Sequence, residues 1–141
     1  MARIIKNKLI PFEGYSALTM FQCIWVREKY YEKVLNSIRT QDHEGTHMKQ
    51  ELEIDITVLI LTILSALILN TSWYWLLVSP VAYLIIYVLN WFIQLLNPFK
   101  SKSAYRSNPM EKEAYYNQDN HEYNKNRKLY AWLGYIFKKA I

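Results

Sequence analysis

The chain has 141 residues, of which 52% are hydrophobic, 16% are aromatic and 21% are charged, with a net charge of +5. This composition excludes collagen-like and disordered chains, and the single Cys23 excludes a disulfide-stapled fold. All 17 Lys and Arg and all 12 Asp and Glu lie outside residues 56–99, which argues against an ordinary water-soluble domain. We therefore expect one membrane-embedded, mainly α-helical domain over residues 1–141.

The part that precedes the uncharged run, residues 1–55, is expected to be cytoplasmic and to contain a small β element. Residues 15–27 are rich in aromatic and β-branched side chains, which favours a strand, paired as a hairpin with residues 3–10. Apolar side chains at helical spacing predict a helix over residues 28–40. A second helix is expected to begin at a cap provided by Thr40 or Asp42.

The uncharged run predicts a transmembrane helical hairpin over residues 56–96. Its arms are residues 56–69 and 73–96, and the turn between them is Asn70–Thr71–Ser72, in which Ser72 can cap the second arm. A spanning helix needs about 20 apolar residues, so the second arm qualifies alone and the first must continue an earlier helix. A hairpin that enters the bilayer without crossing it, and a buried hairpin in a soluble bundle, are the alternatives.

The third part, residues 97–141, is expected to be cytoplasmic and helical. Asn97–Pro98 ends the membrane arm, residues 100–108 read as a polar linker, and Pro109 opens a helix to about Gln118. Residues 123–141 predict a basic amphipathic helix that lies on the membrane or packs on the hairpin base. Both flanks carry many cations, which predicts an integral inner-membrane protein of a bacterium with both termini in the cytoplasm.

The motif His43-Glu44-Gly45-Thr46-His47 carries the clearest chemical signal. On a helix, His43 and His47 lie one turn apart on one face, so both imidazoles can bind one zinc ion. Glu44 lies beside them and can act as the general base that takes a proton from a water at the metal. The spacing predicts a zinc hydrolase site, and solvated helix residues at a membrane edge are the alternative.

A catalytic zinc site needs a third protein ligand and one open position. The hairpin returns the chain to the same membrane face, so the ligand is expected from the region that follows it. The candidates there are Glu111, Glu113, Asp119, His121 and Glu122.

These motifs resemble those of membrane gluzincins, the HtpX-type peptidases and CAAX prenyl proteases. In that family an H-E-x-x-H helix is followed by membrane helices and by an E-x-x-A-D motif whose Glu is the third zinc ligand. The resemblance implies that Glu111, three residues before Ala114, is the third ligand, with Glu113 as the alternative. The family's Asp is replaced by Tyr115, which we place beside the ligands.

The chain also resembles small membrane proteins of Bacteroidetes and their phages. In those proteins a P-F-x-G-Y start, an H-E-x-x-H-x-x-Q-x-E core and an E-x-E-A-Y segment recur. Here they read as residues 11–15, 43–51 and 111–115. This second resemblance implies no activity.

Several further residues are candidates for supporting roles. Gln50 and Glu51 follow His47 by three and four residues, so they share its helix face and can orient a ligand imidazole. His121, or one of Tyr115, Tyr116 and Tyr123, is a candidate donor to the transition state. The strand within residues 15–27 can hold an extended peptide by main-chain pairing if it borders the site.

The sequence therefore favours a small membrane zinc metallopeptidase that acts on a peptide or protein substrate. A non-catalytic membrane scaffold, or a phage-type membrane component with a structural or relic metal site, is the alternative. We expect the bilayer rather than nucleic acid to be the partner of the basic C-terminal segment, because aromatic residues are interleaved with its cations.

Overall fold

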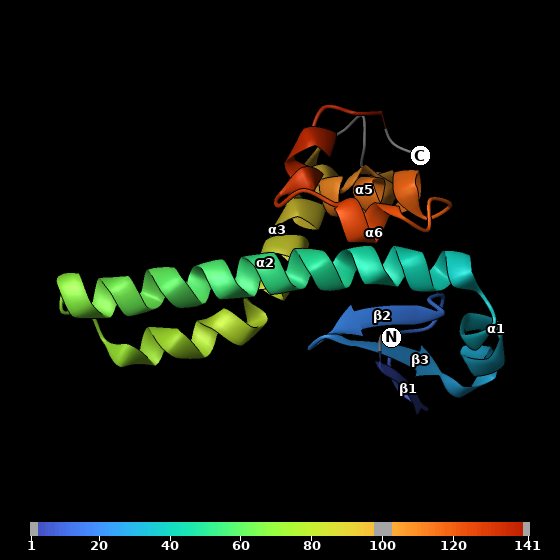
Figure 1. Cartoon of the computed structure of the whole chain (residues 1–141), viewed down its shortest axis with the longest axis horizontal. Coiled ribbons are helices and arrows are strands. Elements are labelled where there is room, and N and C mark those ends of the chain that lie inside the picture. The colour runs from blue at the N-terminus through green and yellow to red at the C-terminus, as the bar shows by residue number, and fades with distance from the viewer. Residues whose placement is uncertain (1–2, 98–102, 140–141) are drawn as a thin grey trace.

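The structure is a computed structural model that describes residues 3–97 and 103–139. It is mainly helical, with a small sheet at the N-terminus, and one long helix, α2 (Ile38–Ile68), runs the length of the molecule (Figure 1). The sheet lies against the first half of α2 on one side, and the C-terminal segments lie against the same half on the other. The mainly helical class predicted from the sequence is confirmed.

The sheet has three strands, β1 (Arg3–Asn7), β2 (Ala17–Met20) and β3 (Cys23–Arg27), in the order β1-β3-β2. The prediction of one strand over residues 15–27 is wrong. That segment is itself an antiparallel hairpin turned at Phe21–Gln22, both with positive φ as in a two-residue hairpin turn, and β1 joins β3 in parallel. No Gly or Asn marks this turn, so the sequence carries no signal for it.

The predicted helix over residues 28–40 is interrupted. A 3-10 turn, η1 (Glu28–Tyr30), leads into α1 (Tyr31–Leu35), and the chain leaves helical geometry before α2 begins. Ser37 is the N-cap of α2, because its side chain accepts from the backbone N–H of Thr40, so neither Thr40 nor Asp42 has the predicted capping role. Buried Val34 packs with Ile24 and Val26 into a core that joins α1 to the sheet.

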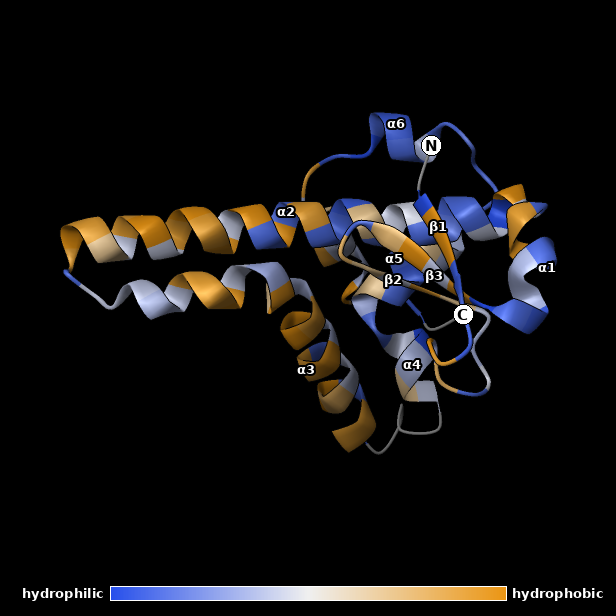
Figure 2. Ribbon diagram, turned by 90° about the horizontal axis from the view of Figure 1, so that it is seen from below, coloured by the Kyte–Doolittle hydropathy of each residue, from blue (hydrophilic) through white to orange (hydrophobic). Residues whose placement is uncertain are grey.

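The predicted continuity between the motif helix and the first apolar arm is confirmed, since α2 is one uninterrupted helix about 46 Å long. After α2 the chain turns at Asn70, whose φ is positive, and Ser72 caps the 3-10 helix η2 (Trp73–Val81). The segment η2 runs back beside the apolar half of α2 (Figure 2).

The second arm is helical over Trp73–Leu96, as predicted, but it is not one regular helix. It divides into η2 and α3 (Ala82–Leu96), and Figure 2 shows α3 leaving the line of η2 at an angle. Pro80 lies at the end of η2, where it removes a backbone donor and prevents a regular helix from continuing. The combined segment Trp73–Leu96 is long and apolar enough to cross a membrane, with a mean hydropathy of 2.0. Only 17% of its most apolar window is buried within the protein.

After the arms come α4 (Ala104–Ser107), within the predicted linker, and α5 (Pro109–Asn117), close to its predicted bounds. Asn108 caps α5 and Pro109 occupies its first turn, as expected. The remaining elements are α6 (Tyr123–Asn126) and the 3-10 helix η4 (Ala131–Tyr135).

The single amphipathic helix predicted over residues 123–141 is wrong within the described range, which ends at residue 139. The chain is extended at Arg127 and has positive φ at Tyr130. The Arg127 side chain is 3% exposed, because it enters the protein interior instead of lying on a basic surface. Parts of the predicted linker and of the final helix lie outside the described residues.

Candidate metal centre

The two histidines of the motif lie on the buried face of α2. His43 is 7% exposed and His47 is 5% exposed, and their Nε2 atoms are 3.2 Å apart. Ser37 fixes where the helix begins, so the motif falls well inside it, where the spacing of four residues places the two rings on one face. Two ring nitrogens that converge in a buried place are a ready pair of ligands for a metal ion.

The third member of the cluster, Glu111, comes from the first turn of α5. Its Oε1 lies 3.2 Å from Nε2 of His47, and its Oε2 lies 3.5 Å from Nε2 of His43. The Asn108 cap and Pro109 set the position of this turn, and Glu111 itself is 2% exposed. All three ligand atoms lie within 4.8 Å of one another, so this buried His-His-Glu cluster can hold a metal ion.

The tautomer of His47 follows from its neighbour Gln50. The amide nitrogen of Gln50 donates to the carbonyl of Met110 and to Oε2 of Glu113, at 3.1 and 2.9 Å. Its oxygen therefore faces Nδ1 of His47, at 2.9 Å, and an amide oxygen can only accept. Nδ1 carries the hydrogen, which leaves Nε2 of the neutral imidazole free for a metal, as is usual for metal-ligating histidines.

Two tyrosines of α3 also contact the ligands. The hydroxyl of Tyr87 donates to Oε1 of Glu111 at 2.6 Å, and the hydroxyl of Tyr83 lies 3.2 Å from Nδ1 of His47. Tyr83 also belongs to a core cluster with Ile54, Ala82 and Met110, which joins α2, α3 and α5. The apolar segment therefore forms part of the wall of the cluster.

Two buried polar atoms of the cluster make no hydrogen bond with any described residue. They are Nδ1 of His43 and Oε2 of Glu111. Oε2 faces Nε2 of His43 without a hydrogen bond, and a carboxylate whose two oxygens each face an imidazole fits a cation held among the three side chains. Nδ1 of His43 lacks the usual acceptor, and the ring of Tyr115 packs against this imidazole with centroids 4.5 Å apart.

The electrostatics of the metal-free cluster are those of an ion pair. Burial lowers the pKa of His47, but the Glu111 carboxylate outweighs that effect and raises it to about 9. Burial likewise acts to raise the pKa of Glu111, but His47 and His43 hold it well below its ordinary value. The cluster therefore holds one proton on His47 near neutral pH, and a cation that binds there must displace it.

Glu44 lies next to the cluster and faces a cleft. Its Oε2 accepts a hydrogen bond from the hydroxyl of Thr19 at 2.8 Å, and this same hydroxyl lies 3.1 Å from the backbone oxygen of Glu44. Glu44 and His43 line one end of a cavity of about 520 Å³. Its other walls come from the segment before β2 and from α4 and α5, and include Gly14, Tyr15, Tyr105, Arg106 and Tyr115. A ligand in this cavity reaches both Glu44 and one metal ligand.

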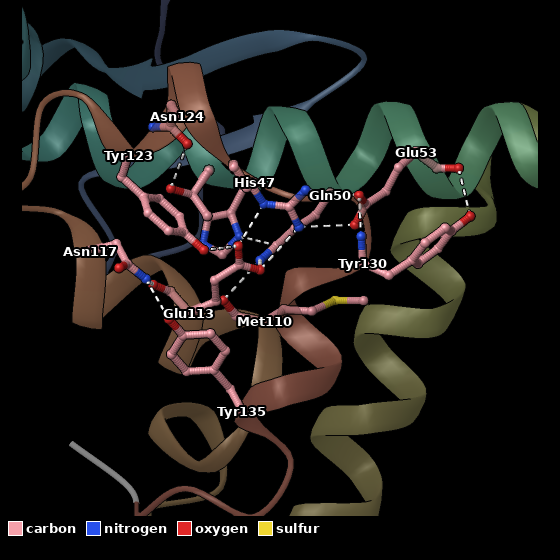
Figure 3. Close-up of polar contacts among 12 residues, drawn as sticks. His47, Gln50, Glu53, Met110, Glu113, Asn117, Tyr123, Asn124, Tyr130 and Tyr135 are labelled. Carbon is pink, nitrogen blue, oxygen red and sulfur yellow. Dashed lines mark hydrogen bonds and ion pairs between the residues drawn. The ribbon is translucent and has the colours of Figure 1, made fainter.

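Glu113, the alternative third ligand, lies in a separate buried network. Its carboxylate accepts from Nε of Arg127 at 2.6 Å, from Tyr123 at 2.7 Å and from Gln50. Arg127 also makes a two-pronged pair with Glu53, at 2.8 and 2.9 Å. Figure 3 shows Glu113 with its partners Tyr123 and Gln50. The structure thus places Glu111, and not Glu113, beside the histidines, while Glu113 acts on His47 through Gln50.

The remaining predicted residues lie away from the ligands. Glu51 accepts from the backbone N–H groups of Phe21 and Gln22, at 2.6 and 2.7 Å, and so joins the hairpin turn to α2. His121 is exposed and pairs with Asp42. Neither side chain contacts His43 or His47 through the interactions the structure describes, whereas Tyr115 packs on His43.

Sequence reasoning missed four contributors: Thr19, Tyr83, Tyr87 and Arg127. The two tyrosines had a detectable signal, since hydroxyl side chains spaced by four residues in an apolar helix form a polar stripe that requires partners. Thr19 and Arg127 had no such signal in the sequence, because their roles depend on the hairpin turn and on the break in helical structure after α6.

Comparisons of this chain with protein-family models, with curated proteins and with solved structures give no match.

Proposed function

We propose that this protein is an integral-membrane zinc metallopeptidase. The observation that carries the proposal is the convergence of His43, His47 and Glu111 from two separate helices, with Glu44 beside them at the end of a cleft. Two imidazoles and one carboxylate are the ligand set of many zinc hydrolases, in which the fourth position is left to the reaction. The orphaned oxygen of Glu111 and the assigned tautomer of His47 both fit that use.

In this proposal His43, His47 and Glu111 hold the zinc ion. When bound, zinc supplies Lewis acidity, which polarises a carbonyl and lowers the pKa of a nearby water. The chain supplies the proton transfers. Glu44 takes a proton from the attacking water, the water oxygen bonds to the peptide carbonyl carbon, and Glu44 returns the proton to the amine nitrogen as the C–N bond breaks.

The cleft supports an extended peptide as substrate. The segment from Gly14 to Ala17 lines it and leads directly into β2, which is an edge strand of the sheet. An extended chain can add to such an edge by main-chain hydrogen bonds. Tyr115 also lines the cleft and keeps its hydroxyl proton available for donation, because burial and Glu111 raise the pKa of this hydroxyl above its ordinary value.

We place the protein in a membrane through Trp73–Leu96 and the apolar half of α2, with both termini in the cytoplasm. The cationic flanks support this orientation, since positively charged segments remain on the cytoplasmic side.

The test is Glu44→Gln in the detergent-purified, zinc-loaded protein, assayed on a peptide library by mass spectrometry. Glutamine keeps the bond to Thr19 but cannot accept a proton, so we expect one metal ion per chain and no cleavage. Glu51→Gln is the matched control, because it changes an equally buried carboxylate that faces the hairpin turn instead of the cleft. Cleavage that persists in Glu44→Gln contradicts the mechanism.

A second candidate is a structural metal site in a non-catalytic membrane protein. It is favoured by the enclosure of the cluster, since all three ligands are under 8% exposed and Tyr87 bonds Glu111 directly. Substitution with cobalt separates the two candidates, because its absorption reports the coordination. A spectrum that responds to a small zinc-binding inhibitor such as a hydroxamate requires an open position, whereas an unresponsive spectrum favours the structural site.

A further inference from the structure

The segment between β1 and β2 contains a motif that the proposed reaction does not use. Residues 8–12 read Lys-Leu-Ile-Pro-Phe, and two of their large apolar side chains point into solvent. Leu9 is 80% exposed and Phe12 is 83% exposed, whereas the intervening Pro11 is buried. We call residues 8–12 the apolar loop.

The backbone of the apolar loop is held from the inside. Oδ1 of Asn7 accepts from the N–H groups of Leu9 and Ile10 at 2.9 and 2.6 Å, and its Nδ2 donates to the carbonyl of Ile10 at 2.8 Å. Arg27 donates to the carbonyls of Leu9 and Pro11. The loop is therefore fixed in shape, with the N–H groups of Leu9 and Ile10 and three of its carbonyls bonded to Asn7 and Arg27, while Leu9 and Phe12 point outward.

This arrangement matches what the surface of a bilayer requires. A backbone that enters an apolar medium must have its polar groups satisfied by the protein, because lipid offers no partners. Lys8 adjoins the tip and is exposed, so it can meet an anionic headgroup. Glu13, the nearest acid, lies 3.7 Å from Arg27, which reduces its repulsion of such a surface.

The loop is also linked to the apolar segment through α4. Tyr15, just beyond the loop, packs edge-on against Tyr105 of α4 with centroids 5.5 Å apart. In turn, α4 packs against α3, the C-terminal part of the apolar segment.

From these observations we propose that the apolar loop inserts Leu9 and Phe12 into the membrane interface as a second anchor beside Trp73–Leu96. Gly14 and Tyr15 follow the loop and line the cleft, so the anchor fixes the height of the cleft above the bilayer. The proposal rests on the membrane segment and does not depend on peptide hydrolysis or on a metal.

The experiment uses the full chain in vesicles of phosphatidylcholine and phosphatidylglycerol. Cys23, the single cysteine, is replaced by Ser, and one cysteine at position 9 carries an environment-sensitive NBD label. We expect blue-shifted emission that is quenched by lipids with a nitroxide near the headgroup. A label at exposed Asn120 should show neither effect, and a label at Leu89 on α3 should be quenched by deeper nitroxides.

A charge at the second anchor position provides the matched test. Phe12→Asp should shift the emission of the label at position 9 to the red and reduce its quenching, whereas Phe21→Asp on the half-exposed hairpin turn should leave both unchanged. The proposal is overturned if the position 9 label is not quenched while Leu89 is. It is also overturned if Leu89 is not quenched, or if blue-shifted emission without lipid quenching accompanies cross-linking of two copies through position 9.

Discussion

The two halves of helix α2 face their surroundings in opposite ways. In its first half the buried side chains are almost all polar, and they include His43, Glu44, His47, Gln50 and Glu53. From residue 56 onward the half is uncharged, and its large apolar side chains are mostly exposed, with Ala66 alone buried among the described residues. A polar interior at one end and an apolar exterior at the other suit the proposed metal site and the proposed contact with lipid, respectively.

The difference lies in what each half requires of its neighbours. The buried polar side chains of the first half have specific partners from β2 and its hairpin turn, from α3, α5 and α6, and from the segment after α6, because an unpaired buried charge is costly. The second half needs only an apolar medium, and the structure gives it η2 and little else. The first half is therefore tested by removing a hydrogen-bonding or charged partner, and the apolar part is tested by asking whether it lies in lipid.

The largest effect on stability is expected from Arg127→Gln. This change leaves Glu53 and Glu113 buried without their shared cation, which should lower the free energy of unfolding by about 3–5 kcal/mol. Zinc affinity should also fall, because Glu113 holds the Gln50 amide that orients His47. Chemical denaturation and zinc titration measure the two effects. Arg39→Gln, which removes an exposed pair with Asp119, should change neither by much, and equal losses in both variants would refute the network.

The apolar segment Trp73–Leu96, by contrast, should respond to an added charge. Leu89→Arg places a cation on the exposed face of α3, which should oppose membrane insertion by about 2.5–3.5 kcal/mol if that face meets the bilayer core. The measurement is the membrane-inserted fraction, assayed with a glycosylation reporter. Glu122→Arg, at an exposed position in the C-terminal part, is the control. Equal insertion of the two variants would mean that α3 is not in lipid.

The pH dependence of the metal-free protein follows from the ion pair in the cluster. The pKa of His47 is about 9 in the folded protein against an ordinary 6.5, so its contribution is full below pH 6.5 and is lost as pH rises through 9. The loss is at most about 3 kcal/mol. Glu111 has the opposite sign, because its lowered pKa makes its contribution disappear as pH falls below its ordinary range.

Denaturation at pH 6 and pH 9 in the presence of a chelator measures this change. The same pair predicts the release of about one proton for each zinc ion bound at pH 7, which calorimetry in two buffers detects. His47→Gln should remove both effects. A metal-free wild type with equal stability at the two pH values would contradict the ion pair.

The smallest effect is expected at the start of α2. Ser37→Ala removes the cap that accepts from the N–H of Thr40 and should cost about 1 kcal/mol of unfolding free energy. Ser103→Ala, before the short α4, serves as the comparison, since Ser103 makes no side-chain cap there. A loss confined to Ser103→Ala would mean that α2 begins elsewhere.

The correct predictions depended on local sequence rules and on the turn that brings the later part of the chain back to the motif helix. The helical spacing of His43 and His47 and the start of α5 at Asn108–Pro109 are local, and a turn near Asn70 brings residue 111 back toward residue 47. The structure accordingly brings Glu111 to the two histidines.

What the sequence did not predict depended on tertiary partners. The positive charge of Arg127 suggested a surface helix, whereas two buried carboxylates from α2 and α5 draw it inward and interrupt that helix. Likewise, Glu51 has the helix-face position of a supporting residue for His47, but the turn at Phe21–Gln22 presents two N–H groups to it. No spacing in the sequence reveals these long-range pairings.

The most direct test of the account is the zinc content of the purified protein. Elemental analysis should find about one zinc ion per chain in the wild type and in Glu113→Gln, and none in His47→Ala or Glu111→Gln, with folding checked by circular dichroism. That pattern would establish His43, His47 and Glu111 as the metal site. A folded wild type without zinc after reconstitution, or zinc retained in Glu111→Gln, would contradict it.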